Sequence, residues 1–178
     1  MKRKGQDIAD GASEQAYETP WKHVRAVEAD SFGGVPFAID VAASERNRKA
    51  PRHYSVNDNG LKRTWVDRTW CNPPYENQGE WLARGVYWAR EHGVRSAFLV
   101  LASTSANYWR PCCFDAGTVD FYEGRIAFLD PATGLPRKGF DRASALVLLG
   151  PGFAPRTVRY RDARTGILIR DDDTPTLL

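Results

Sequence analysis

The apolar positions of the chain fall into short runs that are separated by turn residues. Two runs, SAFLVLAS (96–103) and ALVLLG (145–150), are apolar almost throughout, which is typical of strands that are covered on both faces. Shorter or alternating runs predict further strands. These further strands are expected in PFAID (36–40), RHYSV (52–56), RTWCN (68–72), VDFYEG (119–124) and RIAFLD (125–130).

Helical spacing of the apolar residues predicts two main helices. In ETPWKHVRAVEAD (18–30), Thr19 suits the N-cap and Pro20 the first helical position. In NQGEWLARGVYWAREHG (77–93), apolar residues recur on one face and Gly93 suits the end of the helix. A short helix is also expected in SANYWRPCCFD (105–115).

The order of these elements predicts an α/β fold. Helices and strands alternate through the first two thirds of the chain and strands then follow one another, which favours three layers around a mostly parallel sheet with an antiparallel end. Residues 1–16 are polar and predict a mobile arm, 17–150 form the main domain, and 151–178 form a basic tail. A hairpin turned at 163–166 is expected to carry Arg159, Arg161 and Arg170 outward.

Composition narrows the class of protein. A chain of 178 residues with 42% hydrophobic residues suits one domain with a sizeable core. No apolar run reaches the length of a membrane span, so no membrane partner and a cytoplasmic location are expected. The 3 Cys and 3 His have no metal-ligand spacing, so no metal site is predicted. The net charge of +3, with basic residues gathered in 136–142 and 155–170, permits a nucleic-acid partner.

Candidate chemistry lies at Asn72-Pro73-Pro74-Tyr75, where an expected strand ends. In open α/β sheets, ligands bind beyond the carboxyl ends of the strands. The prolines fix an extended turn, leaving the Asn72 side-chain oxygen and the Pro73 carbonyl oxygen as two rigid acceptors. Two such acceptors suit the N–H groups of a planar exocyclic amine, and a well-placed acceptor can lower a transfer barrier by roughly 2–4 kcal/mol. The alternative is a turn that merely ends the strand.

Four stretches together resemble the phage-type DNA N6-adenine methyltransferases, the Dam-like family that uses S-adenosylmethionine. The resemblance runs from about residue 17 to about residue 149. The stretches are ETPWKHV, FAIDVAASERNRKAPRHYS, GLKRTWVDRTWCNPPYENQGEWLARG and EGRIAFLDPATGLPRKGFDRASALVLL.

By this resemblance, Asn72, Pro73, Pro74 and Tyr75 receive a flipped-out adenine. The cofactor-binding residues that it implies are Thr19, Pro20, Asp40, Ala42, Ala43 and Asp58. Alternatives remain for several of these positions: Thr19 and Pro20 also make an ordinary helix start, Asp40 can cap a turn, and Asp58 lies in the turn cluster NDNG. The glycine-rich loop of typical methyltransferases is absent, and small Ala42 and Ala43 stand in its place.

The resemblance implies a Rossmann-like methyltransferase domain, of phage or prophage origin, that methylates adenine N6 in double-stranded DNA. Because that nitrogen lies inside a duplex, the base must be flipped out to reach the site. GATC is the first sequence to test. The alternatives are methylation of a protein glutamine amide or an RNA base, and a catalytically silent DNA-binding protein. The DNA-binding candidates are Arg137, Lys138, Arg142, Arg159 and Arg161.

Overall fold

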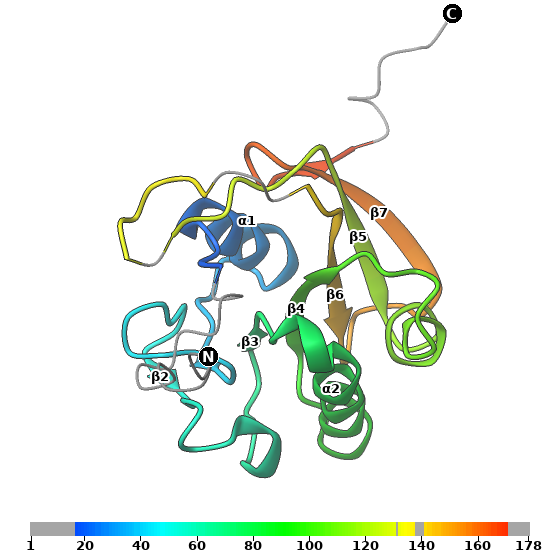
Figure 1. Ribbon diagram of the computed structural model, residues 1–178. Coiled ribbons are helices and arrows are strands. Elements are labelled where there is room, and N and C mark those ends of the chain that lie inside the picture. The colour runs from blue at the N-terminus through cyan, green and yellow to red at the C-terminus, as the bar shows by residue number, and fades with distance from the viewer. Residues whose placement is uncertain (1–16, 131, 138–140, 171–178) are drawn as a thin grey trace, which may run out of the picture.

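An eight-stranded sheet forms the centre of the protein. The computed structural model describes residues 17–130, 132–137 and 141–170 (Figure 1). The strand order across the sheet is β2-β1-β3-β4-β6-β5-β7-β8. The strands are β1 (Ile39–Asp40), β2 (Arg52–His53), β3 (Thr69–Cys71), β4 (Ser96–Leu101), β5 (Thr118–Glu123), β6 (Ser144–Leu149), β7 (Thr157–Asp162) and β8 (Leu168–Ile169). The predicted α/β class is therefore confirmed.

Few helices accompany this sheet. The α-helices are α1 (Trp21–Ser31) and α2 (Gln78–His92), and the shorter helical turns are η1 (Gly60–Lys62), η2 (Tyr75–Asn77) and η3 (Arg110–Phe114). Gly93 ends α2 at a φ of 65°, as its position in the sequence predicts. In the described ranges, neither α1, α2 nor any shorter helix combines the length and apolar composition that a bilayer crossing requires.

The sheet is more mixed than the sequence predicts. Strands β2, β1, β3 and β4 run parallel to one another, and β6 is antiparallel to both of its neighbours, β4 and β5. Beyond them, β7 is parallel to β5, and β8 returns antiparallel to β7. The parallel half therefore places the carboxyl ends of β1, β2 and β3 at one edge of the sheet, where the prediction expects a ligand.

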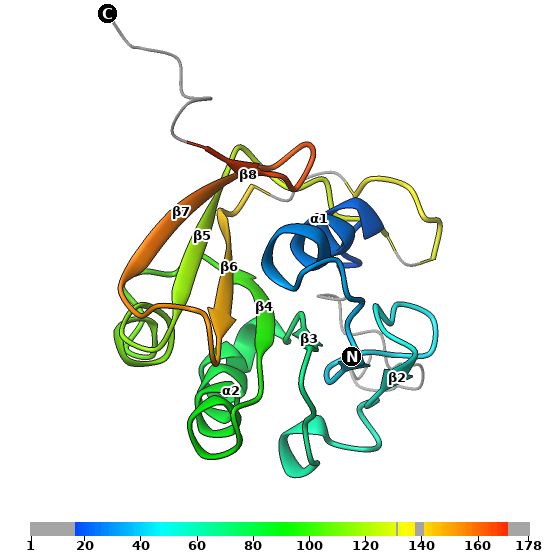
Figure 2. The ribbon, with the colours of Figure 1, turned by 180° about the vertical axis from the view of Figure 1, so that it is seen from behind.

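The two main helices cover opposite faces of the sheet (Figures 1 and 2). Side chains alternate along β4, so that Leu99 joins the apolar cluster of Val27 in α1 and Phe98 joins that of Leu82 in α2. All six residues of β4 and all six of β6 are buried, which explains why these two strands are apolar almost throughout.

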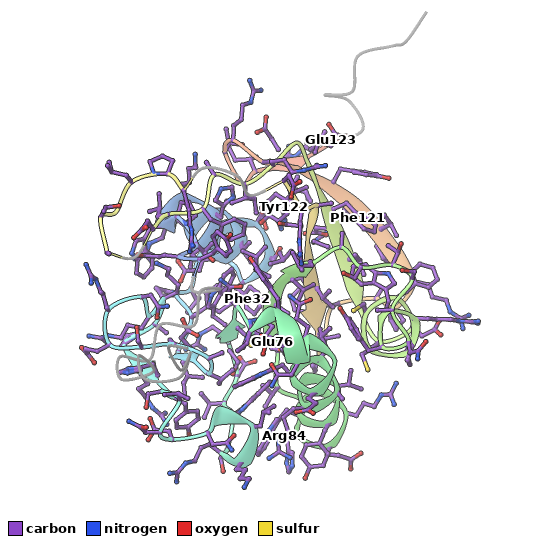
Figure 3. All side chains as sticks on the ribbon, viewed as in Figure 1. Phe32, Glu76, Arg84, Phe121, Tyr122 and Glu123 are labelled. Carbon is purple, nitrogen blue, oxygen red and sulfur yellow. The ribbon has the colours of Figure 1, made fainter. Side chains whose placement is uncertain are left out.

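The alternation continues on β5 at the other side of the sheet. Phe121 and Tyr122 are neighbours in the chain and point to opposite faces (Figure 3). Tyr122 is buried in the cluster beneath α1, whereas the half-buried Phe121 packs on the cluster beneath α2 and contacts Trp109 with a ring distance of 6.0 Å.

The predicted strand at 125–130 does not form. Leu129 makes isolated bridges to Glu18 and to Pro136, and the segment belongs to no strand of the sheet. Ile126 and Phe128 are nevertheless buried in the cluster beneath α1. Burial against a helix thus produces the alternating pattern that the sequence suggests for a strand.

The C-terminal hairpin is confirmed, but the outward direction expected for its arginines is wrong at Arg161. That side chain is fully buried, and its guanidinium group contacts Asp120 and Asp30, each at 2.7 Å. Arg159 also pairs with Asp120, at 2.7 Å. Because Asp120 is buried on β5 beside β7, its carboxylate draws both arginines toward the sheet. Arg170 is exposed, as predicted.

Candidate active site

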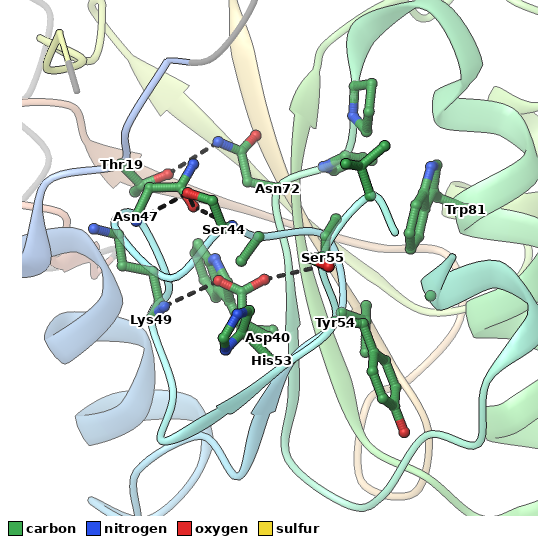
Figure 4. Close-up of a pocket in the computed structure, with 18 of the residues that line it drawn as sticks. Thr19, Asp40, Ser44, Asn47, Lys49, His53, Tyr54, Ser55, Asn72 and Trp81 are labelled. Carbon is green, nitrogen blue, oxygen red and sulfur yellow. Dashed lines mark hydrogen bonds between the residues drawn. The ribbon is translucent and has the colours of Figure 1, made fainter. Parts of the chain in front are cut away.

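A cavity of about 1140 Å³ opens where β1, β2 and β3 end (Figure 4). Its position agrees with the rule that open α/β sheets bind ligands beyond the carboxyl ends of parallel strands. Segments that follow these three strands form most of the wall, and residues before α1 close one side. The main lining segments are 17–19, 40–47, 53–57, 59–61 and 72–74.

Asn72 follows β3 directly and lines this cavity. Its amide nitrogen, Nδ2, donates a hydrogen bond to the carbonyl oxygen of Tyr17 at 3.1 Å. The same nitrogen donates to Oγ1 of Thr19 at 3.3 Å (Figure 4). Within the described residues, neither Asn72 Oδ1 nor the Pro73 carbonyl oxygen has a hydrogen-bond partner. The two oxygens expected to act as acceptors are therefore not occupied by competing bonds in this part of the chain.

Thr19 does not act as the N-cap that the sequence predicts. The N-cap of α1 is Pro20, without a side-chain hydrogen bond, and the helix begins at Trp21. Thr19 is buried at 1% exposure and directs its hydroxyl group to Asn72, which lies 53 residues away in sequence. Of the two cofactor-binding candidates in this segment, Thr19 lines the cavity and Pro20 does not.

Tyr75 lies beside the cavity without lining it. It begins η2, and its ring centroid is 5.9 Å from that of Tyr17, which does line the cavity. Burial raises the pKa of the Tyr75 hydroxyl and Tyr17 adds to this effect, while the charges of Arg142 and Arg137 act in the opposite direction. Tyr17 is therefore an aromatic wall of the site that the NPPY pattern gives no means to identify.

Asp40 ends β1 and lines the cavity as a buried carboxylate. Its oxygens accept the backbone N–H groups of Lys49 at 3.0 Å and of Ala42 at 3.3 Å. Burial raises the pKa of this carboxyl group to about 7, although the two N–H bonds and the charge of Lys49 oppose the rise. Asp40 thus caps the turn after β1, as one interpretation of the sequence expects, and also lines the cavity, so its role in binding a cofactor stays a prediction. Ala42 and Ala43 line the cavity beside it.

Asp58 takes the turn role rather than a place in the cavity wall. Its Oδ2 accepts the backbone N–H of Ser55 at 2.8 Å and the hydroxyl of Ser55 at 2.6 Å. These bonds lower the pKa of Asp58. Its neighbours Asn57 and Asn59 line the cavity, but Asp58 itself does not.

Gly60 allows two backbone segments of the cavity wall to lie in close contact. The sequence suggests only Ala42 and Ala43 as small residues that allow close approach at this site. A Cβ atom at this position would lie 2.1 Å from the carbonyl oxygen of Val41 and 3.0 Å from the Trp81 ring. The segment after β2 can therefore lie directly against the end of β1. The sequence does offer a signal for this contact, namely the glycine that follows the turn residues NDN, because a glycine can mark a close backbone contact as well as a turn.

Among the described residues that line the cavity, acidic side chains outnumber those of Arg and Lys. Lys49 is buried and pairs with Glu18, with 2.7 Å between Nζ and Oε1. Arg46 donates to the carbonyl oxygen of Ala132 at 2.9 Å. The acidic lining residues are Glu18, Asp40, Glu45, Glu76 and Glu80, whereas Arg46 and Lys49 are the Arg and Lys residues of the described lining. This balance favours a ligand that carries positive charge.

The chain between Leu129 and β6, called the basic loop because it carries Arg137 and Arg142, lies next to the same wall. Arg137 places its guanidinium carbon 4.6 Å from the ring centroid of Tyr17, and Arg142 is exposed. Glu18 and Leu129 exchange two backbone hydrogen bonds, of 3.0 and 2.9 Å, and Leu129 also bridges to Pro136. The loop is thus joined to residues 17–19, the segment whose Tyr17 and Thr19 accept hydrogen bonds from Asn72. Lys138, a further DNA-binding candidate, lies outside the described residues. Arg161, being fully buried, has no surface to offer a ligand.

Comparison with known proteins gives one family and two phage relatives. A family model described as DNA N-6-adenine-methyltransferase (Dam) matches residues 9–166. A DNA N-6-adenine-methyltransferase of Haemophilus phage HP1 (strain HP1c1) is 26% identical over 137 residues, covering 76% of this chain and 78% of that protein. One of Escherichia phage T1 is 25% identical over 163 residues, covering 82% of this chain and 66% of that protein.

Proposed function

The chain belongs to the DNA N-6-adenine-methyltransferase (Dam) family, and on this premise we propose that it transfers a methyl group from S-adenosylmethionine to the N6 nitrogen of adenine in double-stranded DNA. The observation that carries the proposal is a pair of acceptors in the cavity wall, Asn72 Oδ1 and the Pro73 carbonyl oxygen, that have no hydrogen-bond partner among the described residues. The phage relatives favour a phage or prophage origin.

The cavity fits the proposed cofactor in size and charge. A volume of about 1140 Å³ has room for a nucleoside with a side arm and for a base next to it. The excess of acidic lining residues suits a sulfonium cation. Asp40, Ala42 and Ala43 line the end of β1, and Gly60 allows the neighbouring segment to approach. The helices on both faces of the sheet and the site at its parallel half support a Rossmann-like, three-layer assignment.

Bound S-adenosylmethionine supplies an electrophilic methyl group, and the protein's residues prepare the amine that receives it. An adenine amino group is a weak nucleophile, because its lone pair is delocalised into the ring. Asn72 Oδ1 and the Pro73 carbonyl oxygen accept hydrogen bonds from the two N–H groups of this amine. These bonds favour the pyramidal geometry that the nitrogen needs to attack the methyl group. Asn72 is a neutral amide and cannot take up the proton, so this residue acts by position and the proton leaves to solvent.

Tyr17 and Tyr75 are suited to hold the base once it has left the duplex. Their rings lie 5.9 Å apart beside Asn72, and Tyr17 faces the cavity. Stacking of a base on an aromatic ring contributes about 1–3 kcal/mol. Arg137 and Arg142 lie close to this pair and offer positive charge to the DNA phosphates.

Replacement of Asn72 by alanine tests the function. We expect Asn72→Ala to abolish methyl transfer, because one acceptor is lost, while the affinity for S-adenosylmethionine stays near the wild-type value, because the rest of the wall is intact. Transfer of labelled methyl groups into DNA, RNA and protein measures the activity, and titration calorimetry measures cofactor binding. Label appearing in protein or RNA instead of DNA, or full activity of the variant, would contradict the proposal.

A further inference from the structure

We infer that Thr19 is a positioning residue for Asn72, and that the segment 17–19 fixes which atom of the Asn72 amide faces the reacting amine. The inference rests on the proposed function and adds a residue to its machinery. Its direct observation is the pair of hydrogen bonds from Asn72 Nδ2, to the Tyr17 carbonyl oxygen at 3.1 Å and to Thr19 Oγ1 at 3.3 Å.

An asparagine side chain needs hydrogen bonds that fix its orientation, because the oxygen and the NH₂ group of its amide have almost the same shape. Turning the amide by half a turn exchanges an oxygen that accepts for an NH₂ group that donates. In the wrong orientation, Nδ2 of Asn72 would face the N–H bonds of adenine, donor against donor. Amide orientation therefore decides whether this position helps the reaction or opposes it.

The two partners of Nδ2 select one orientation. The carbonyl oxygen of Tyr17 can only accept, so it favours Nδ2 at its side and repels Oδ1. Thr19 Oγ1 provides a second acceptor for the same nitrogen. With Nδ2 held by both, Oδ1 is the amide atom left without a partner among the described residues. The protein thus keeps the acceptor available before any substrate arrives.

The segment that carries these partners is anchored on two sides. Glu18 exchanges backbone hydrogen bonds with Leu129 in both directions, and its carboxylate pairs with buried Lys49 at 2.7 Å. Thr19 itself is buried at 1% exposure. Its hydroxyl group serves Asn72 while the N-terminus of α1 has no side-chain cap, although Thr is a favoured capping residue. This use of the hydroxyl group is expected of a positioning residue and not of a helix start.

The test compares Thr19→Val, which keeps the shape and removes the acceptor, with Thr19→Ser, which keeps the acceptor. We expect Thr19→Val to slow single-turnover methyl transfer about 10-fold, because one of two anchoring hydrogen bonds is lost. Thr19→Ser should recover most of the rate, and the affinities for DNA and for S-adenosylmethionine should stay near wild type in both variants. A decrease in cofactor affinity that accounts for the slower transfer would overturn the inference.

Thr118→Val is the matched control for the loss of a buried threonine hydrogen bond. Thr118 is 3% exposed, donates from Oγ1 to the Ala154 carbonyl oxygen at 3.0 Å and does not line the cavity. We expect this variant to lose folding stability without a change in the transfer rate constant. If both valine variants slow transfer equally, the effect of Thr19 is one of stability, and the inference fails.

A readout that does not depend on catalysis separates this inference from the proposed function. The side-chain amide signal of Asn72 in ¹⁵N-labelled protein, identified by its loss in Asn72→Asp, reports its hydrogen bonds through the rate of proton exchange. Exchange should accelerate in Thr19→Val and stay unchanged in Thr118→Val. If wild-type protein fails to methylate DNA, the proposed function fails, and this exchange comparison still decides whether Thr19 holds the amide. Unchanged exchange in Thr19→Val overturns the inference.

Discussion

Asp40 ends β1 and Asn72 directly follows the neighbouring parallel strand β3, and both side chains line the same cavity. In the proposed function, Asn72 presents a neutral acceptor, and the hydrogen bonds of its Nδ2 to Tyr17 and Thr19 favour one orientation of the amide. Asp40 is a carboxylate that burial makes costly to ionise. The chemical properties of a residue in this site therefore depend on its hydrogen-bond partners and its burial as much as on its amino-acid type.

The sequence identifies these residues better than it identifies their partners. Asn72 can be found because two prolines follow it at the end of a strand, and Asp40 because it ends an apolar run. The acceptor at Tyr17 is a backbone carbonyl oxygen, which any residue carries, so no pattern of side chains indicates it. Thr19 precedes a helix and belongs to a residue type that often caps helices, so the sequence suggests a local role and gives no sign of its bond to a residue distant in sequence.

Asp40 predicts a dependence of stability on pH. Its pKa is raised from 3.8 to about 7 in the folded protein. Below about pH 4 the group is protonated in both the folded and the unfolded chain. Between about pH 4 and about pH 7, the unfolded chain releases the proton while the folded protein keeps it, so the free energy of unfolding falls as the pH rises. The total decrease from this group is about 4 kcal/mol, and it is complete above about pH 7.

Urea unfolding of wild type and Asp40→Asn at a series of pH values measures this effect. The variant cannot ionise at position 40, so the stability of wild type relative to the variant should decline from pH 4 to pH 7 and then remain level. A constant offset between the two proteins is expected as well, because the amide offers only one oxygen to the N–H groups of Lys49 and Ala42. A difference that does not change with pH would show that Asp40 ionises as easily in the folded protein as in the unfolded chain.

At the scale of helices and strands, the pattern of apolar and polar residues predicts poorly what each buried residue packs against. The segment 125–130 alternates like a strand, but its buried residues pack beneath α1 without joining the sheet. β7 places Val158 and Tyr160 on its exposed face and Arg161 on its buried face, the reverse of the usual preference. The reversal follows from Asp120 on the neighbouring strand, since a buried carboxylate requires a cation within reach.

Arg161 is therefore expected to serve folding rather than DNA binding. Arg161→Met leaves Asp120 with Arg159 alone and removes the ion pair with Asp30, so the free energy of unfolding should fall by about 3–5 kcal/mol. Arg164→Met is the control, because that side chain is 90% exposed and its pair with Asp162 is screened by solvent, so this variant should unfold at nearly the same urea concentration as wild type. Urea unfolding measures both. A variant at 161 that keeps its stability but binds DNA more weakly would support a DNA-binding role for this residue instead.

For the molecule as a whole, the parallel half of the sheet carries the cavity, and the basic loop reaches it from the other half. The sequence predicts the fold class, the position of the cavity and the main helices, because local periodicity and the order of elements determine them. It does not predict that Leu129 and Pro136 meet the segment 17–19 that contacts Asn72, because these contacts join residues separated by up to about 120 positions.

The position of Arg142 predicts a role in binding DNA. Arg142 is exposed, and its charge acts on Tyr75 at the edge of the cavity. Arg142→Ala should weaken binding to DNA of any sequence and reduce the slope of log K against log salt by about 0.9 for each phosphate that the variant no longer neutralises. Fluorescence anisotropy with a labelled duplex at several NaCl concentrations measures this slope. Arg164→Ala, an exposed change in the C-terminal hairpin, should leave it unchanged.

The bridge from Glu18 through Leu129 to Pro136 limits how this enzyme family member can be redesigned. Under the proposed function, grafting residues 132–137 of a relative onto this chain would also replace part of the support for Thr19, and hence for the amide of Asn72. Transplants that keep residues 128–130 and 136 of this chain should retain turnover, whereas exchange of the entire loop should need a matching N-terminal segment from the same donor. If the proposed function holds, this loop and the reacting end of β3 therefore have to be exchanged together.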